Sequence, residues 1–460
     1  MPLADAFSKL PPAPCYWVAL SGGLDSTVLL HALVTVQAML QAQPPASIRA
    51  LHVHHGLSEH ADHWLASCEA LCADLGVPLE SVGVKVEPRG RGLEDAAREA
   101  RYRVFEQTLP AGHCLLAAHH ADDQAETLLL RLMRGSGPRG LAAMADSRAL
   151  GRGRLHRPFL GVTRAQLEDY ARAHHLHWVE DDSNTDERFD RNFLRAQVMP
   201  RLRQRWPGLA RAWGESARLC AESEQLLGEL AGEDLEQALC LAVSSRPTLA
   251  PVLDITRLRE LSPPRRHNLL RHWLRSKSLP VPGREHLKQI DQQLIRGRED
   301  SRARVQWEAL ELHRFRSGLY LLSSRWFDPG SDSRPRTGLA FTPDRGEALS
   351  LPDGGRLEVE RAAGSAAGPG LPILRPGLGA LTVRWREGGE RCQPVGRAHS
   401  QALKKLLQEH DLEPWWRSQV PLVYRGDVLV AVGDLWVCQG FGAGGEEPGH
   451  RLIWRPPGSF

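Results

Sequence analysis

A short apolar run near the start of the chain leads into Ser21-Gly22-Gly23-Leu24-Asp25-Ser26, which has the residue types of a phosphate-binding loop. The two glycines allow a tight turn and a close approach of the backbone to an anion. The helix expected from Ser26 would present unpaired N–H groups and its positive dipole end to a pyrophosphate. Ser21 and Ser26 add hydroxyl donors, and Asp25 can hold Mg²⁺ against phosphate oxygens. A serine-capped structural turn is the alternative, but all six residues at a strand–helix junction favour a site that binds a pyrophosphate group.

A second group of reactive side chains lies in the run His119-His120-Ala121-Asp122-Asp123-Gln124-Ala125-Glu126-Thr127. Asp123 and Glu126 are one helical turn apart, so their carboxylates can share a face and bind a metal or the ammonium group of an amine. His119 is a candidate general base near neutral pH. The alternatives are structural, because the two carboxylates can form a capping box and a histidine at a strand end is often merely packed. The position just after a buried strand favours a ligand site.

Arg101 is the remaining candidate for the chemistry. In the helix expected over Glu94–Phe105 it lies at the border of the apolar stripe, whereas Arg98 points further away. A border arginine can reach into a cleft and neutralise the charge of a phosphate in a transition state. A surface arginine whose aliphatic part covers apolar neighbours explains the position equally well.

Other nucleotide-binding motifs do not fit the chain. The pattern G-x-x-x-x-G-K-[ST] is absent, which argues against a P-loop kinase or GTPase. Gly135–Gly140 matches G-x-G-x-x-G, but it follows a helix rather than a strand. We therefore predict a loop there and not a dinucleotide-binding turn.

The elements that position these residues alternate between strand and helix over residues 1–210. This alternation predicts an α/β fold with a doubly wound parallel sheet. Strands are expected at Tyr16–Leu20, Ile48–His54, Leu79–Val86 and Cys114–Ala118. Helices are expected over Ser26–Leu40, from Ser58 to about Leu75, over Glu94–Phe105, along the apolar stripe Ala125–Met133, and from a Thr163–Gln166 capping box to His175.

The pattern changes after Pro207, and we predict three further segments. Residues 211–326 form a helical domain with helices over Glu215–Leu241 and Arg265–Arg275 and a terminal hairpin of Val305–Leu310 with Leu319–Leu322. Residues 327–376 are rich in Gly, Pro, Ser and Asp, which indicates a linker or a loosely β-structured connector. Residues 377–460 form a small α+β domain with strands at Leu381–Trp385, Pro421–Tyr424, Val428–Val432 and Leu435–Gln439 and a helix around Ser400–His410.

Composition narrows the class of protein without naming it. No segment has the long apolar stretch of a membrane span, and the first residues lack the pattern of a signal peptide, so we expect a cytoplasmic protein. None of the eight cysteines forms a C-x-x-C pair, which argues against zinc ribbons and iron–sulfur ligation. The net charge of +3 is carried mostly by Arg, a composition that permits an RNA partner without demonstrating one.

Ser21–Ser26 matches S-G-G-x-D-S, the signature of the PP-loop ATP pyrophosphatases, whose fold is of the adenine nucleotide alpha hydrolase-like kind. The rest of the chain resembles one family among them, the tRNA(Ile)-lysidine synthetases. The motifs that carry the resemblance are His52–Leu57, Ala118–Gly137, Arg157-Pro158, Asp182-Ser183-Asn184 and Arg191-Asn192-Phe193-Leu194-Arg195, followed by Val383–Arg391, Leu403–Leu406 and Pro414–Arg417 in the tail. Two departures are His54, where Asn is more usual, and the length of the 327–376 segment.

The resemblance implies a reaction on the wobble cytidine of a tRNA(Ile) with the anticodon CAU. ATP with Mg²⁺ would adenylate the C2 oxygen, and free L-lysine would displace AMP to give lysidine. It assigns ATP to the Ser21–Ser26 loop, Mg²⁺ to Asp25 and lysine to Asp123 and Glu126. It implies no membrane and no protein partner, and it leaves a homodimer open.

Basic and aromatic residues of the middle and tail are candidates for tRNA contacts. A solvated basic face with tryptophans in the core is the alternative, and it is slightly favoured for the middle helix. The candidates are Arg265, Arg266, Arg271, His272, Trp273 and Arg275 in the middle domain, and Trp385, Arg386, Arg391, Lys404, Lys405, Trp415, Trp416 and Arg417 in the tail.

Two rival functions stay open at this point. A tRNA cytidine thiolase of the same superfamily would require cysteine pairs, which the chain lacks. A binding module with an inactive PP-loop is the other, and the presence of Asp25, Asp123 and Glu126 argues against it.

Overall fold

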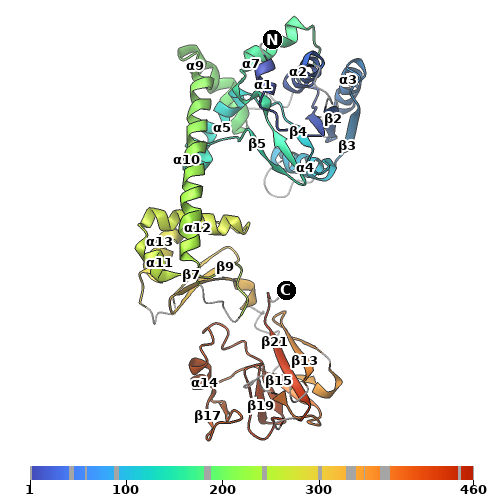
Figure 1. Cartoon of the computed structure of the whole chain (residues 1–460). Coiled ribbons are helices and arrows are strands. Elements are labelled where there is room, and N and C mark those ends of the chain that lie inside the picture. The colour runs from blue at the N-terminus through green and yellow to red at the C-terminus, as the bar shows by residue number, and fades with distance from the viewer. Residues whose placement is uncertain are drawn as a thin grey trace. The chain divides into compact units, whose positions relative to one another are not determined.

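The structure is a computed structural model of the 460-residue chain, shown in Figure 1. It describes residues 3–40, 46–56, 60–86, 93–180, 188–240, 246–298, 303–327, 338–346, 348–362, 373–443 and 447–458. The chain divides into two compact units, Met1–Leu226 and Leu227–Phe460. Each unit is described by itself.

The first unit is built on a six-stranded sheet in the order β3-β2-β1-β4-β6-β5. All neighbouring pairs are parallel except the pair of β5 with β6. Apolar side chains are buried on both faces of β1 and β4, as expected for central parallel strands. The strands are β1 (Cys15–Ala19), β2 (Ser47–His54), β3 (Leu79–Gly83), β4 (Cys114–Leu116), β5 (Ser147–Leu150) and β6 (Gly153–His156).

Helices cover both faces of this sheet. One core contains residues of α1, α2, α3 and α7, and a second core, on β1, β2, β4 and β6, contains residues of α4. The predicted doubly wound α/β fold is therefore confirmed. The helices are α1 (Ala4–Phe7), α2 (Leu24–Leu40), α3 (Ala61–Asp74), α4 (Leu93–Thr108), α5 (Ala121–Met133), α6 (Pro138–Leu141), η1 (Pro158–Gly161) and α7 (Arg164–Ala173).

Three local predictions in this unit have different outcomes. The Thr163–Gln166 capping box is present at the start of α7. The loop predicted over Gly135–Gly140 is wrong in part, because the short helix α6 begins at Pro138. Proline is tolerated at the first position of a helix, where a backbone N–H would have no partner within the helix. The predicted cap Ser58 lies outside the described residues.

A helical segment closes the first unit and continues into the second. It contains α8 (Asp190–Phe193), the π-helical turn η3 (Leu194–Val198), α9 (Met199–Arg205) and the long helix α10 (Leu209–Ala238). The boundary between the two units falls within α10.

The second unit begins with helices packed on an antiparallel sheet in the order β7-β10-β9-β8. The predicted hairpin of Val305–Leu310 with Leu319–Leu322 is right in its second strand, which lies in β10 and pairs with β9, but wrong in its first. The chain turns at Glu308 with a positive φ of 50°, so the first segment is divided between β8 and β9. The elements are β7 (Leu253–Asp254), α11 (Ile255–Glu260), α12 (Pro263–Ser276), α13 (Arg284–Gln289), η4 (Ile290–Ile295), β8 (Arg304–Trp307), β9 (Leu310–Phe315), β10 (Gly318–Ser323) and η5 (Ser324–Trp326).

The rest of the second unit forms sheets in the orders β11-β15-β18-β19-β20 and β12-β13-β21-β14, with the pair β16-β17. β13 pairs along its whole length with β21 and β11 pairs with β15, so strands of 327–376 belong to both sheets of the tail. This favours the β-structured alternative over a linker. The elements are β11 (Leu339–Phe341), η6 (Pro343–Arg345), β12 (Leu349–Ser350), β13 (Arg356–Ala362), β14 (Ile373–Leu374), β15 (Leu381–Arg384), β16 (Arg391–Cys392), β17 (Gln401–Ala402), α14 (Leu403–Glu409), β18 (Leu422–Arg425), β19 (Val428–Val432), β20 (Trp436–Val437) and β21 (Gly449–Arg455).

Candidate active site

The loop Ser21–Ser26 joins β1 to α2 beside the point where the strand order reverses between β1 and β4. Open α/β sheets bind ligands at such a point. Gly22 has a φ of +86°, and a Cβ atom there would lie 3.1 Å from Val179 Cγ2 and 3.2 Å from Cys68 Sγ. The turn therefore requires glycine both for its conformation and for its surroundings.

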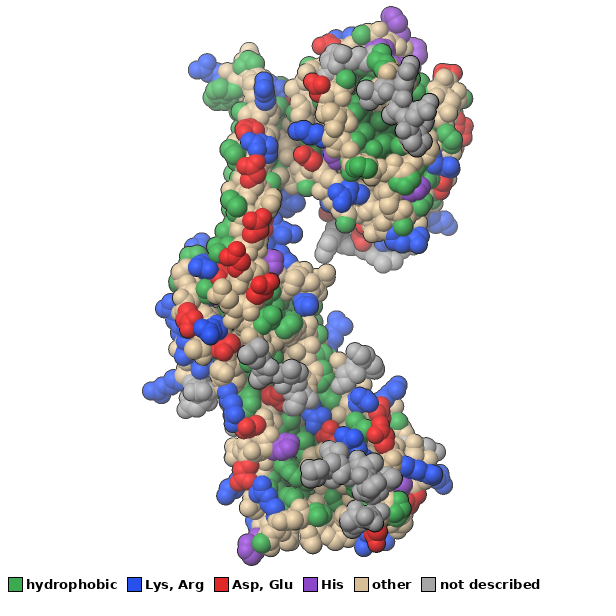
Figure 2. All heavy atoms as spheres, in the orientation of Figure 1, with side chains coloured by type: hydrophobic (Ala, Val, Ile, Leu, Met, Phe, Trp, Pro, Cys, Tyr) green, Lys and Arg blue, Asp and Glu red, His purple; other side chains and the backbone are tan. Residues whose placement is uncertain are grey.

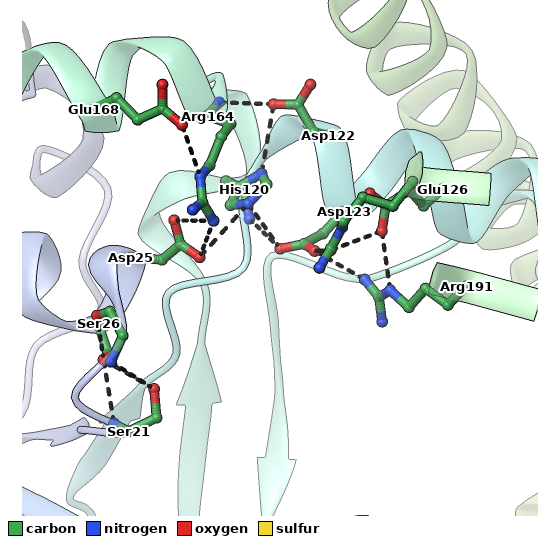
Figure 3. A network of polar contacts seen from close by, with 12 residues as sticks. Ser21, Asp25, Ser26, His120, Asp122, Asp123, Glu126, Arg164, Glu168 and Arg191 are labelled. Carbon is green, nitrogen blue, oxygen red and sulfur yellow. Dashed lines mark hydrogen bonds and ion pairs between the residues drawn. The ribbon is translucent and has the colours of Figure 1, made fainter. Parts of the chain in front are cut away.

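Hydroxyl groups hold the loop in shape. The Ser26 hydroxyl donates to the Gly23 carbonyl at 3.1 Å and accepts the Ser21 backbone N–H at 3.2 Å. The Ser21 and Ser26 hydroxyls lie 3.1 Å apart, as Figure 3 shows. Because Leu24 starts α2, the N–H groups of the first helical turn have no partner within the helix and suit an anion.

Asp25 lies in the first turn of α2 and faces two cationic partners. Its carboxylate accepts hydrogen bonds from one Nη of Arg164 at 3.1 and 3.2 Å, and His120 Nε2 lies 3.8 Å away. Burial raises the pKa of Asp25, although His120 and Arg164 act in the opposite direction. A carboxylate in this position fits Mg²⁺, which is usually held by one or two carboxylates together with substrate phosphates.

Asp123 and Glu126 share one face of α5, as predicted, and two arginines from the following helical segment bind both carboxylates. Arg191 donates to Asp123 at 2.9 Å and to Glu126 at 3.0 Å. Arg195 donates to Asp123 at 3.0 Å and to the two oxygens of Glu126 at 3.0 and 2.9 Å. The Glu126 side chain is 1% exposed, so these contacts replace water almost completely.

The structural alternative, a capping box of Asp123 with Glu126, is not what the structure shows. α5 begins at Ala121, whereas that pairing would require Gln124 as the first helical residue, and Asp123 accepts the backbone N–H of His120 at 3.1 Å. Glu126 is left for the arginines, and its role is not that of a cap.

Carboxylates in this network are in contact with arginines and with His120 (Figure 3). Burial alone would raise the pKa of Asp123, but His120 and Arg191 hold it down at about 2. Burial would lower the pKa of His120, but Asp122, Asp123 and Asp25 raise it, so its imidazole is stabilised as a cation. Asp122 also contacts an Arg203 Nη at 2.7 Å and accepts the Arg164 backbone N–H at 2.7 Å.

His119 does not fit the predicted role of a base near neutral pH. Burial lowers its pKa to about 3, and the nearby guanidinium groups of Arg157 and Arg191 add to the effect. Its Nδ1 atom has no hydrogen-bond partner among the described residues. An imidazole with this pKa is neutral at pH 7 and accepts a proton poorly.

Arg101 lies on the helix that follows β3. It is exposed on α4, and its charge helps burial lower the pKa of His55 to about 4. The neighbouring Arg98 lies over the ring of Tyr102, with 5.0 Å between the guanidinium carbon and the ring centroid. The role of Arg101 at a phosphate stays a prediction.

Sequence reasoning did not assign functions to several residues that complete the site. Arg164 and His120 contact Asp25, and Arg191 and Arg195 contact the acidic pair. A usable signal was the four-residue spacing of Arg191 and Arg195, which places both on one side of a helical segment. Asp182-Ser183-Asn184 lies outside the described residues.

Several residues predicted as candidates for RNA contact belong to the core. Trp273, Trp385 and Trp416 are buried, and the buried Arg266 pairs with Asp291 at 2.6 Å. They are not free to stack on bases. Lys404 and Lys405, in contrast, are exposed on α14. On the face seen in Figure 2, basic side chains alternate with acidic ones and form no single extended patch.

Membrane-spanning helices and metal-binding clusters are both absent from the described residues. These residues contain no helix with the length and apolar character needed to cross a bilayer. They also contain no cluster of three or more His, Cys, Asp or Glu side chains arranged to hold a metal ion.

A parallel sheet with a glycine turn at its switch point, a helix N-terminus and an adjacent acidic group define a nucleotide-binding enzyme of the PP-loop class. The family model described as PP-loop domain matches residues 3–202. The models described as TilS substrate binding domain and TilS substrate C-terminal domain match residues 253–320 and 381–454.

Similar proteins cover almost the whole chain. A tRNA(Ile)-lysidine synthase of Xanthomonas campestris pv. campestris is 42% identical over 99% of this chain and 98% of its own length. One from Serratia proteamaculans is 43% identical over 95% of each chain, and one from Yersinia pestis is 41% identical over 99% of this chain and 97% of its own. The chain belongs to the tRNA(Ile)-lysidine synthase family, whose members are ATP-dependent ligases that modify tRNA. The resemblance stated from the motifs is confirmed.

Proposed function

We propose that this enzyme ligates free L-lysine to C2 of the wobble cytidine in tRNA(Ile) with the anticodon CAU. ATP adenylates the C2 oxygen with release of pyrophosphate, and the ε-amine of lysine then displaces AMP to give lysidine. The observation that carries the proposal is the buried acidic pair Asp123–Glu126 on the helix that follows β4, the strand next to the Ser21–Ser26 loop. The synthase names of its full-length relatives support it.

ATP binding is assigned to the loop at the start of α2. The turn at Gly22 and Gly23 and the first N–H groups of the helix receive the pyrophosphate portion, and Ser21 and Ser26 add hydroxyl groups. Asp25 would hold Mg²⁺, which supplies charge neutralisation on the phosphate oxygens. Arg164 is then free to turn from Asp25 toward phosphate oxygens.

Lysine selection is assigned to Asp123 and Glu126. Free lysine carries an α-ammonium, a carboxylate and a reactive ε-amine, so the pocket must distinguish two amines. The acidic pair binds the α-ammonium, and Arg191 and Arg195 bind the carboxylate, since both arginines already reach this position. This arrangement leaves the ε-amine to point toward the activated cytidine.

The ε-amine must lose a proton before it attacks. His119 is a weak base because its pKa is about 3, and His120 is held as a cation by the surrounding carboxylates. We therefore assign this proton to neither histidine.

The tRNA requires a larger surface than the catalytic network provides. We assign part of it to exposed basic residues of the tail, Lys404 and Lys405 on α14. A reaction on ATP, free lysine and tRNA also fits the predicted cytoplasmic location.

The direct test is mass analysis of the nucleosides of a CAU tRNA(Ile) after incubation with enzyme, ATP, Mg²⁺ and lysine. We expect a cytidine whose mass has increased by one lysine less one water, and no product when either lysine or ATP is omitted. Replacement of the wobble cytidine by uridine is the matched control. Formation of AMP and pyrophosphate without a lysine adduct would refute the assignment of lysine as the nucleophile.

A further inference from the structure

Two cysteines of the second unit lie close together in the core of the tail. Cys392 ends β16 and Cys438 directly follows β20, and their Sγ atoms are 2.9 Å apart. The side chains are 2% and 6% exposed. Both thiols are free, and a disulfide bond of about 2.05 Å would require less than about 1 Å of sulfur movement.

The backbone holds this pair together independently of the sulfur atoms. Cys438 forms an antiparallel bridge with Pro394, and the Gln439 N–H donates to the Gln393 carbonyl at 2.7 Å. The segment after β16 is therefore attached to β20 on both sides of Cys438. A cross-link here would join two segments that are already paired.

We propose that Cys392 and Cys438 form a reversible disulfide when the enzyme meets a peroxide, and that this disulfide protects the tail from irreversible oxidation. In a reducing compartment both thiols stay reduced, so the cross-link is a response to oxidant and not a permanent part of the fold. This modification site is separate from the proposed reaction with lysine.

Cys438 is the thiol that reacts first. The two thiols share a hydrogen bond, and this bond and one from the Gln393 backbone lower the pKa of Cys438, whereas the pKa of Cys392 is raised. The Cys438 sulfur attacks one oxygen of hydrogen peroxide, the O–O bond breaks, and the departing hydroxide takes up the thiol proton and leaves as water. Cys438 becomes a sulfenic acid.

Cys392 then completes the reaction. Its sulfur attacks the sulfur of the sulfenic acid, the S–O bond breaks, and a second water leaves with the thiol proton. Two thiols and one hydrogen peroxide thus give one disulfide and two waters. A dithiol reductant reverses the reaction by thiol–disulfide exchange.

Three other buried thiols, all in the first unit, are less reactive. Burial raises the pKa of Cys68 to about 12 and that of Cys72 and Cys114 to about 11, so each keeps its proton at neutral pH. Since the thiolate is the reactive form, these cysteines should respond much more slowly. Cys438 combines a lowered pKa with a second sulfur in reach.

The test uses the full chain, fully reduced and then exposed to hydrogen peroxide. Remaining thiols are alkylated after unfolding, and the peptides are mapped by mass spectrometry without reduction. We expect a peptide that links Cys392 to Cys438, its loss on treatment with dithiothreitol, and full recovery of both thiols. A Cys220→Ser variant is the control, because it removes a half-buried thiol and should leave the link unchanged.

A Cys392→Ser variant tests whether the disulfide protects Cys438 from irreversible oxidation. Without Cys392, the sulfenic acid on Cys438 should react with dimedone. If dimedone is not added, it should be oxidised further to a sulfinic acid that dithiothreitol does not reverse. The proposal is overturned if Cys392 and Cys438 are still alkylated as thiols at a peroxide dose that oxidises Cys220. Equal recovery of Cys438 in wild type and Cys392→Ser would overturn the protective role. The wild-type map alone decides whether the bond forms if the variant does not fold.

Discussion

Replacing Glu126 by Gln tests the proposed lysine pocket. The substitution keeps the length and shape of the side chain but removes the negative charge that faces Arg191 and Arg195. If Glu126 binds the α-ammonium of lysine, the variant loses one charge-assisted interaction. Such an interaction contributes about 1.5–3 kcal/mol, so the KM for lysine should rise roughly ten- to a hundredfold.

The resting structure supports the upper part of that range for binding, and it also predicts a cost in stability. Glu126 is 1% exposed and accepts three hydrogen bonds of 2.9–3.0 Å, so its charge is poorly screened by water. Gln can accept with one atom only, and its NH₂ group would face guanidinium donors. Because Arg191 and Arg195 are 28% and 39% exposed, they can turn toward solvent and relieve part of this conflict.

The assay is steady-state kinetics with lysine, ATP and tRNA varied in turn, at a temperature below the unfolding midpoint of the variant. The matched control is Glu99→Gln, the same substitution in an exposed carboxylate that pairs with Arg103 on α4. A metal-binding role for Glu126 would raise the KM for ATP together with that for lysine. A KM for lysine unchanged within about twofold, well below the tenfold expected from a lost charge-assisted bond, would refute the pocket.

Three further substitutions test other parts of the site. Asp25→Ala should abolish AMP formation in a folded protein, because it removes the carboxylate assigned to Mg²⁺; AMP release at the wild-type rate would contradict that assignment. The double substitution Lys404→Ala with Lys405→Ala should raise the KM for tRNA and leave the KM for ATP unchanged. It should also reduce the salt dependence of tRNA binding by about one unit of slope per lost phosphate contact. An unaltered salt dependence would exclude these lysines from the tRNA surface. His119→Asn should reduce the stability that the protein loses as the pH falls from about 6.5 to about 3, since an imidazole whose folded pKa is about 3 takes up a proton on unfolding in this range. The urea midpoint of the variant should therefore depend less on pH than that of the exposed control His177→Asn. Parallel curves for the two variants would contradict the lowered pKa.

The catalytic sheet could be predicted because its strands are buried on both faces. The apolar runs at Tyr16–Leu20 and Cys114–Ala118 each coincide with an observed strand to within two residues at either end. The antiparallel strands β8 and β9 were harder, since they join through a turn at Glu308 that contains no glycine. A positive φ at such a residue leaves no composition signal to separate the two strands.

The site was predicted only in part, for a related reason. The residues of Ser21–Ser26 are contiguous, so their types and their order are enough to indicate a phosphate loop. The partners of Glu126 lie 65 and 69 residues further along the chain. No local pattern links such positions, and only the folded chain shows that Arg191 and Arg195 bind the acidic pair. The prediction of His119 as a base near neutral pH did not take account of burial. Burial lowers the pKa of His119, and the sequence alone does not show that this side chain is buried.

The resting network also shapes how substrates would bind. Four carboxylates, those of Asp25, Asp122, Asp123 and Glu126, contact four arginines, so neither set of charges is free in the described structure. A cation that binds a carboxylate must displace an arginine, and the displaced arginine is then best paired with an anion. ATP and lysine each bring both signs of charge: Mg²⁺ with phosphates in one case, and an ammonium with a carboxylate in the other. Each substrate can therefore replace an existing ion pair by two new ones, whereas a simple amine without a carboxylate would leave an arginine unpaired. We therefore expect the arginines, as much as the acidic pair, to select an amino acid over other amines.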